Sequence, residues 1–252
     1  MTARDAAIGA LPIALLIGLW ALIAGMGWAP PALLPAPGAV FLRLLQQLQT
    51  VTFLDHVGTT LFRLFAGFGI AVVLGIGLGI AAVGSRVVAA ALRPLIRVLA
   101  PIPKVALYPA LILTLGFDHA SKVALVAADA VFPILLATYL GSAAVEPKLV
   151  WSARAAGASR LRCLFTIVLM AALPSILTGC RIGLVIACIV VFLAEMITST
   201  DGLGHLLVRA ARSFQTVDMF VPLIAISLLG LTLNAVFNAL RAWLLRHEAE
   251  TG

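Results

Sequence analysis

Long apolar runs, separated by short polar or proline-rich stretches, dominate this chain. The hydrocarbon core of a bilayer is about 30 Å thick, so a spanning helix needs roughly 20 consecutive apolar residues. Runs of that length lie near 8–27, 57–83, 93–117, 121–141, 166–197 and 218–243. The pattern predicts an all-α integral membrane protein with about six transmembrane helices. The second and fifth runs are long enough to tilt or to project beyond the bilayer.

Composition agrees with a membrane protein and excludes a soluble globular domain. Of the 252 residues, 63% are hydrophobic and only 11% are charged, and the mean hydropathy is +1.15. The first run could be mistaken for a signal peptide, but no compact Ala-x-Ala site precedes Trp28 and five further runs follow. We therefore expect residues 1–252 to form a single transmembrane domain that retains the first run as a helix.

Basic residues are distributed along the chain in a way that predicts its orientation. If the amino terminus is inside, eleven of the seventeen Lys and Arg residues fall at cytoplasmic positions: Arg4, Arg86, Arg93, Arg97, Lys104, Lys148, Arg154, Arg160, Arg162, Arg241 and Arg246. The positive-inside rule then places both termini in the cytoplasm. The net charge of +7 is a topology signal, and nucleic-acid binding is a poorer interpretation because the charges are divided among loops.

Proline and glycine mark irregular or closely packed places. Residues 28–38 contain four prolines and one glycine, which predicts an outer loop, and 39–50 has helical apolar spacing that suits the outer membrane surface. The second run contains Gly67, Gly69, Gly75, Gly77 and Gly79, which favours close approach of a neighbouring helix. The third run opens with Pro101 and Pro103, which indicates an interrupted helix beside protein or a cavity.

A short basic segment at about 142–165 lies between two apolar runs and suits a docking loop. Pro147 is typical of a first helical turn, Gly157 of a left-handed helix end, and Ser159 of a helix N-cap. We predict a helix, a hinge and a second helix.

The motif in this segment resembles the cytoplasmic coupling loop of binding-protein-dependent ABC importer permeases. That family's pattern is Glu-Ala-Ala, three residues, Gly, nine residues, then Ile-x-Leu-Pro. Gly157, Ile167 and Leu169 match it, and 153–159 matches an Ala-Arg-x-x-Gly-Ala-Ser core. Trp151 stands in place of the Glu, and Met170 in place of the first Pro. The strings at 33–37, 101–109, 132–135 and 177–182 resemble the nitrate, sulfonate and taurine branch.

This resemblance implies the partners of the protein and its cellular location. It implies a multi-pass protein of the bacterial plasma (inner) membrane that pairs with a second permease copy, as a homodimer, with two ATPase subunits and with an extracytoplasmic substrate-binding protein. The partner ATPase would bind and hydrolyse ATP, and this chain would hold no cofactor. The sequence also lacks a Gly-x-x-x-x-Gly-Lys-Ser/Thr phosphate loop. The residues implied in ATPase coupling are Glu146, Trp151, Ser152, Ala153, Arg154, Gly157, Ala158 and Ser159. The solute would be small and usually anionic, although the branch also includes carriers of vitamin precursors.

Ionisable residues inside the predicted spans are the remaining candidates. A charge in hydrocarbon is costly unless it faces protein, water or a partner charge, which makes Lys104, Asp129, Arg181 and Glu195 candidates for the translocation pathway. Lys104 could instead extend to the inner surface, and Asp129 could hydrogen-bond a neighbouring helix. Arg181 is expected to pair with a carboxylate or a helix end, and Glu195 with a basic residue near the outer half.

Two other function classes remain open from the residues alone. Asp129 and Glu195 could serve an ion-coupled secondary transporter, although the halves show no inverted repeat, and a non-transporting membrane scaffold is the third class. Catalytic and metal sites are not expected, because the four histidines are far apart in the sequence and the three cysteines lack metal-site spacing.

Overall fold

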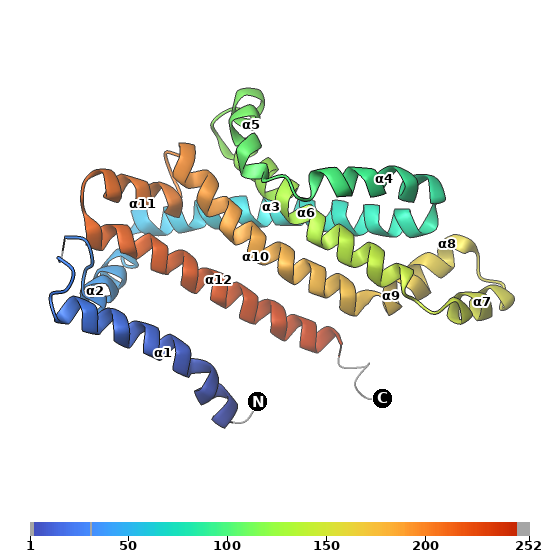
Figure 1. The fold of residues 1–252 in the computed structure, drawn as a ribbon. Coiled ribbons are helices and arrows are strands. Elements are labelled where there is room, and N and C mark those ends of the chain that lie inside the picture. Colours follow the sequence, from blue (N-terminus) through green and yellow to red (C-terminus); the bar gives the residue numbers. More distant parts are fainter. Residues whose placement is uncertain (1–2, 31, 246–252) are drawn as a thin grey trace.

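The computed structural model describes the backbone of residues 3–30 and 32–245, and side chains from residue 11 onward. Arg246 and His247, and the side chain of Arg4, lie outside the described part. The chain is all-α, as predicted (Figure 1). Its elements are α1 (Ala3–Gly25), α2 (Pro37–Gln47), α3 (Val51–Gly84), α4 (Arg86–Leu99), the 3-10 turn η1 (Lys104–Leu107), α5 (Tyr108–Leu115), α6 (His119–Ala143), α7 (Pro147–Ala155), α8 (Arg160–Cys163), the π-helical turn η2 (Leu164–Val168), α9 (Leu169–Ala171), α10 (Leu173–Thr198), α11 (Leu203–Arg212) and α12 (Thr216–Leu244).

In the described part of the chain, four helices are long and apolar enough to cross a membrane, namely α3, α6, α10 and α12. A fifth candidate is the pair α4 and η1–α5, which is bent by 88° at its break. The expected third span at 93–117 is therefore not one straight helix. Pro101 and Pro103 lack the N–H that a continuing helix needs, and each disfavours helical geometry in the residue before it. Figure 1 shows α4 alongside α3 and α5 projecting from the bundle.

The expected first and fifth spans also differ from the observed helices. Within the described side chains, the apolar part of α1 covers only Leu11–Gly25. The run at 166–197 is divided, because the π-helical turn η2, the short α9 and a turn residue, Ala172, precede α10, which begins at Leu173. Pro174 then occupies the first turn of α10, where its missing N–H costs nothing.

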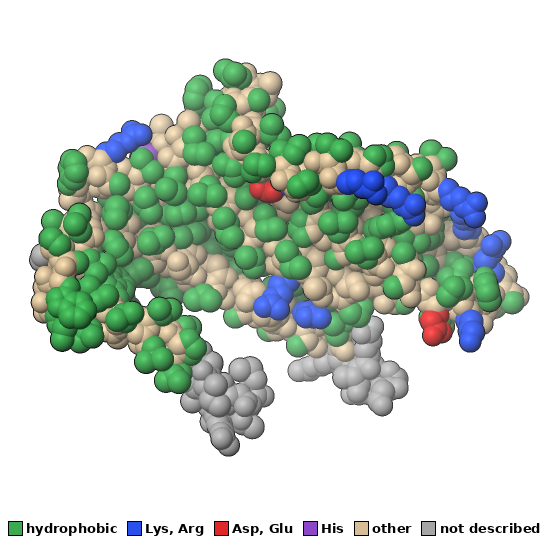
Figure 2. Space-filling model, viewed as in Figure 1, with side chains coloured by type: hydrophobic (Ala, Val, Ile, Leu, Met, Phe, Trp, Pro, Cys, Tyr) green, Lys and Arg blue, Asp and Glu red, His purple; other side chains and the backbone are tan. Residues whose placement is uncertain are grey.

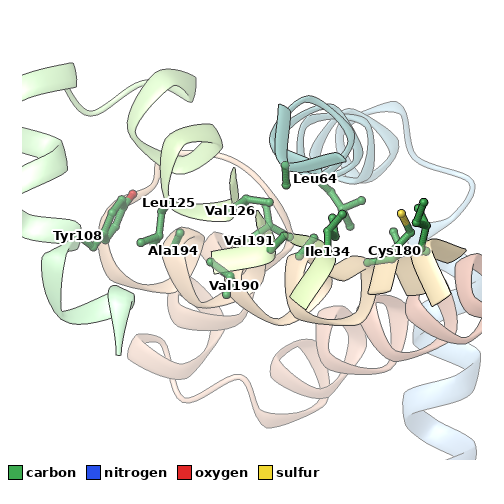
Figure 3. Close-up of a cluster of buried hydrophobic side chains, with 14 of the residues drawn as sticks. Leu64, Tyr108, Leu125, Val126, Ile134, Cys180, Val190, Val191 and Ala194 are labelled. Atoms are coloured by element: carbon green, nitrogen blue, oxygen red, sulfur yellow. The ribbon is translucent and has the colours of Figure 1, made fainter. Parts of the chain in front are cut away.

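The core is a layer in which α6 packs between α3 and α10. Leu64, Leu125, Val126, Ile134 and Val191 are among its fully buried side chains (Figure 3). Since lipid is as apolar as this core, the helices are held mainly by close packing.

Glycine makes that close packing possible on one face of α3 only. A Cβ at Gly67, Gly75 or Gly79 would lie 2.6 to 2.8 Å from side-chain carbons of α6, whereas Gly69 and Gly77 face open space. The expectation that all five glycines mark close approach is thus correct for three of them. On α10, Gly179 and Gly183 meet α6 in the same way.

A second apolar cluster closes one end of the bundle. Val40 and Leu44 of α2 pack with Phe53, Leu203 and Val221, so the predicted segment 39–50 does form a helix, observed at Pro37–Gln47. Trp20 of α1 donates a hydrogen bond to the Pro35 carbonyl, 2.9 Å away. Most of α12 remains unburied, since only 17% of its most apolar window lies inside the protein. Its exposed face must meet lipid or another subunit.

Candidate functional site

The predicted coupling loop has the expected helix–hinge–helix geometry. Pro147 begins α7. Gly157 has φ +89, and the Gly157 and Ala158 amides donate to the carbonyls of Arg154 and Ala153, each at 3.0 Å. This pair of bonds is the Schellman termination, for which glycine in the left-handed region is best suited. The Ser159 hydroxyl then caps α8 by accepting from the Arg162 amide at 3.3 Å.

The loop exposes two large apolar side chains among its basic residues. The Trp151 side chain is on α7 and the residue is 67% exposed, and Leu161 of α8 is 68% exposed. Glu146 precedes α7 without capping it. Among the other predicted coupling residues, Ser152 and Arg154 are exposed, while Ala153 and Ala158 are half-buried.

A hydrogen bond connects the loop to the C-terminal end of α3. Arg160 donates to the carbonyl of Gly84, the last residue of α3, at 3.0 Å. This hydrogen bond links the loop to the longest helix of the core.

A buried charge cluster lies toward the opposite end of α3. Arg63 and Glu195 are each only 1% exposed, and Arg63 Nη1 lies 2.9 Å from Glu195 Oε1. Arg63 Nη2 also pairs with Asp201 Oδ1, and its Nε donates to His119 Nδ1 at 3.1 Å. Arg63 precedes Gly84 by 21 residues, about 30 Å along an α-helix. The cluster and the coupling loop are thus a bilayer thickness apart.

The Glu195 carboxylate is fully supplied with donors. Besides Arg63, it accepts from the Thr60 hydroxyl at 2.9 Å and from the Gly204 amide at 3.1 Å. A Cβ at Gly202, whose φ is +94, would overlap this carboxylate. Burial alone would raise the pKa of Asp201, but the hydrogen bond and the charge of Arg63 outweigh it and hold that pKa below its ordinary value. The cluster therefore joins α3, α10 and the start of α11.

Sequence reasoning missed most of this cluster. Glu195 was expected to find a basic partner near the outer half, and it does, but Arg63 was not among the residues predicted for the translocation pathway. Three histidines that are far apart in the sequence meet here: His119 beside Arg63, and His56 and His205 with stacked rings 6.1 Å apart. The sequence feature that could have indicated this cluster is Arg63 itself, because a charged residue within an apolar run needs a partner.

Lys104 and Asp129 form a second internal ion pair. Lys104 Nζ lies 3.2 Å from Asp129 Oδ1 and 4.4 Å from the centroid of the Phe132 ring. Lys104 is only 8% exposed, so the alternative in which it extends to the inner surface is wrong. Asp129 is bound by this ammonium group instead of by a neutral helix partner. The bend at 100–103 brings Lys104 against α6.

Arg181 lies on the surface of this chain and not in its interior. Its Nε donates to Asn234 Oδ1 of α12 at 3.0 Å, so within the described chain its partner is an amide instead of the expected carboxylate or helix end. Both residues line an apolar groove of about 600 Å³ between α10 and α12. Because this groove lies on the exposed face of α12, we expect lipid or another subunit to cover it.

Known proteins resemble this chain over most of its length. Residues 71–248 match the family described as binding-protein-dependent transport system inner membrane component. The chain is 32% identical to the taurine transport system permease TauC of Escherichia coli (strain K12), covering 92% of this chain and 87% of that protein. It is 31% identical to SsuC of Bacillus subtilis (strain 168), described as an aliphatic sulfonates transport permease, covering 94% and 86%.

A solved structure shares the fold. The inward-facing MetNI methionine ABC transporter aligns with a TM-score of 0.66 at 16% identity, covering 77% of this chain and 96% of that chain. The match to the family model and the relatives over nearly the whole chain establish that this protein belongs to the binding-protein-dependent transport system inner membrane components, the multi-pass permeases of ABC importers.

Proposed function

We propose that this permease imports a small anionic solute of the sulfonate or taurine class, as a homodimer that two ATPase subunits drive and an extracytoplasmic binding protein supplies. In this arrangement α7 and α8 face the cytoplasm together with both termini. The Arg63 cluster lies at the extracytoplasmic end. The sulfonate and taurine transport of the two relatives supports the substrate class.

The observation that carries the ATPase contact is the exposed coupling loop. Trp151 replaces the acidic residue of the family pattern, and an indole buries a large apolar area with one N–H, as interface anchors do. Because α8 is bonded to the end of α3, closure of the ATPase pair would move α3 and switch the pathway between inward-facing and outward-facing states.

An ion-coupled carrier is less well supported. Such a carrier would need acids that gain and lose ions, but Glu195 is bound by Arg63, the Thr60 hydroxyl and the Gly204 amide, and Asp129 by Lys104. Both acids serve the packing of helices in this chain.

The test is reconstitution of the permease with its ATPase and binding protein in liposomes. Uptake of taurine or an alkanesulfonate should require ATP inside and should persist when the proton gradient is collapsed. Uptake that is lost with the gradient and indifferent to ATP would refute the proposal.

The docking role of Trp151 has a matched control. Trp28, 72% exposed, lies in the loop after α1, at the other end of the molecule. Trp151→Ala should weaken ATPase association by about 2 kcal/mol, roughly thirtyfold in Kd, with little dependence on salt. Trp28→Ala should leave ATPase affinity unchanged. Equal ATPase affinity for wild type and Trp151→Ala would exclude the anchor.

A further inference from the structure

A cavity of about 550 Å³ lies beside α11, at the end of the bundle away from the coupling loop. Its wall includes Thr198, Ser199 and Thr200 at the end of α10, and His205, Arg209 and Arg212 on α11. The helix buries Leu203, Gly204 and Ala210 against the bundle. Figure 2 shows basic side chains with a histidine beside them over the region of α11. The polar side of α11 therefore borders a space large enough for a small organic solute.

The two arginines of this cavity are available to a ligand. Arg209 and Arg212 are three residues apart, so they lie on one face of the helix, and both are exposed. Neither forms an ion pair or a side-chain hydrogen bond with any residue in the described part of the chain. Two unpaired guanidinium groups within one turn suit the oxygens of an anionic group, which arginine binds with paired N–H donors.

The neighbouring acids do not cancel these charges. Glu195 and Asp201 are both bound by Arg63, and Asp218 by Arg43. Asp118, the remaining acid of the wall, forms no ion pair with a described residue. The cavity thus keeps a positive side at α11 and a single negative group from the loop before α6.

The wall also offers a neutral hydroxyl group. The Thr200 hydroxyl makes no hydrogen bond within the described chain and is exposed, so it is available to a ligand. His205 Nδ1 lies 2.6 Å from the Ser199 carbonyl and must donate to it, which fixes the ring beside the cavity.

We propose that this cavity is an anion-binding vestibule, in which Arg209 and Arg212 hold the oxyanion group of a small solute such as a sulfonate before it enters the pathway. The assignment of a sulfonate rests on the proposed function, whereas oxyanion binding by the cavity does not. Sulfate shares the same chemistry and can serve as the probe.

The experiment measures sulfate binding to the purified full-length permease by isothermal titration calorimetry at low ionic strength. The Arg209→Gln/Arg212→Gln variant should lose at least tenfold in affinity. Arg86→Gln/Arg97→Gln, which removes two exposed arginines of α4, should bind as wild type does. Asp118→Asn should bind sulfate more tightly, because it removes a negative charge facing the anion; a purely structural role for this wall would not produce that gain.

Other results of the sulfate titration would contradict the proposed vestibule. No saturable binding by wild type, or equal losses in both arginine variants, would reduce the effect to general surface charge. Normal sulfate affinity in Arg209→Gln/Arg212→Gln, together with loss of binding-protein association, would make the arginines a docking surface instead.

Uptake by the reconstituted transporter separates this proposal from the function proposed above. If taurine is imported equally by wild type and by Arg209→Gln/Arg212→Gln, the vestibule fails and the substrate class stands. If neither taurine nor alkanesulfonates are imported but sulfate binding still depends on the two arginines, the vestibule stands and the substrate class fails.

Discussion

Arg63 should be among the most costly side chains of this protein to remove. Its side chain is 2% exposed and that of Glu195 is fully buried. Arg63→Met therefore leaves the buried Glu195 carboxylate without its nearest counter-charge. Breaking a buried pair in this way costs about 3 to 5 kcal/mol. Glu195→Gln should cost less, because Arg63 keeps Asp201 and because an amide can still accept from Thr60.

The surface pair of Arg43 and Asp218 supplies the matched control. Its side chains are 42% and 27% exposed, and exposed pairs contribute about 0 to 1 kcal/mol. Arg43→Met should thus be nearly neutral. At about 2 to 4 °C per kcal/mol for a chain of this size, the two variants should differ in Tm by roughly 10 °C.

Thermal unfolding of the detergent-purified protein, followed by near-ultraviolet circular dichroism, measures this difference. The double variant Arg63→Met/Glu195→Gln should be less destabilised than the sum of its single variants, because it leaves no unpaired charge between these two positions. The reasoning is refuted if Arg63→Met and Arg43→Met lower Tm equally.

Three further predictions concern helix packing and the coupling loop. Gly75→Ala should lower Tm through overpacking against α6, a cost of about 1 to 3 kcal/mol, whereas Gly77→Ala, which faces open space, should raise or preserve it. Lys104→Met should destabilise the protein by about 1 to 3 kcal/mol by leaving Asp129 unpaired; adding Asp129→Asn should restore part of the lost Tm, and no restoration would contradict the pairing. Gly157→Pro cannot adopt φ +89, so membrane insertion should be normal on a Western blot of isolated membranes while ATP-dependent uptake is lost; unchanged uptake would show that the hinge is dispensable.

The sequence alone determined the features that depend on local chemistry or on the membrane. The apolar runs located α6 and α12 within two residues at each end and predicted the existence of α3 and α10, although these two helices begin six and seven residues away from the predicted starts, because bilayer thickness sets the length of a spanning helix. The coupling loop was equally predictable, since the preferences of Pro147, Gly157 and Ser159 act on their own backbone. Pro101 and Pro103 indicated an interruption, although not the 88° bend.

Only the tertiary structure decided how the helices are rotated against one another. That rotation pairs Arg63 with Glu195 and Lys104 with Asp129, gathers three histidines around one cluster, and turns Gly75 toward α6 but Gly77 away from it. Lipid and protein interior are both apolar, so the hydrophobic pattern of a membrane helix does not mark which face is buried. Those contacts are set by packing between residues far apart in the chain, such as Arg63 and Glu195, which are 132 positions apart, and no local preference specifies them.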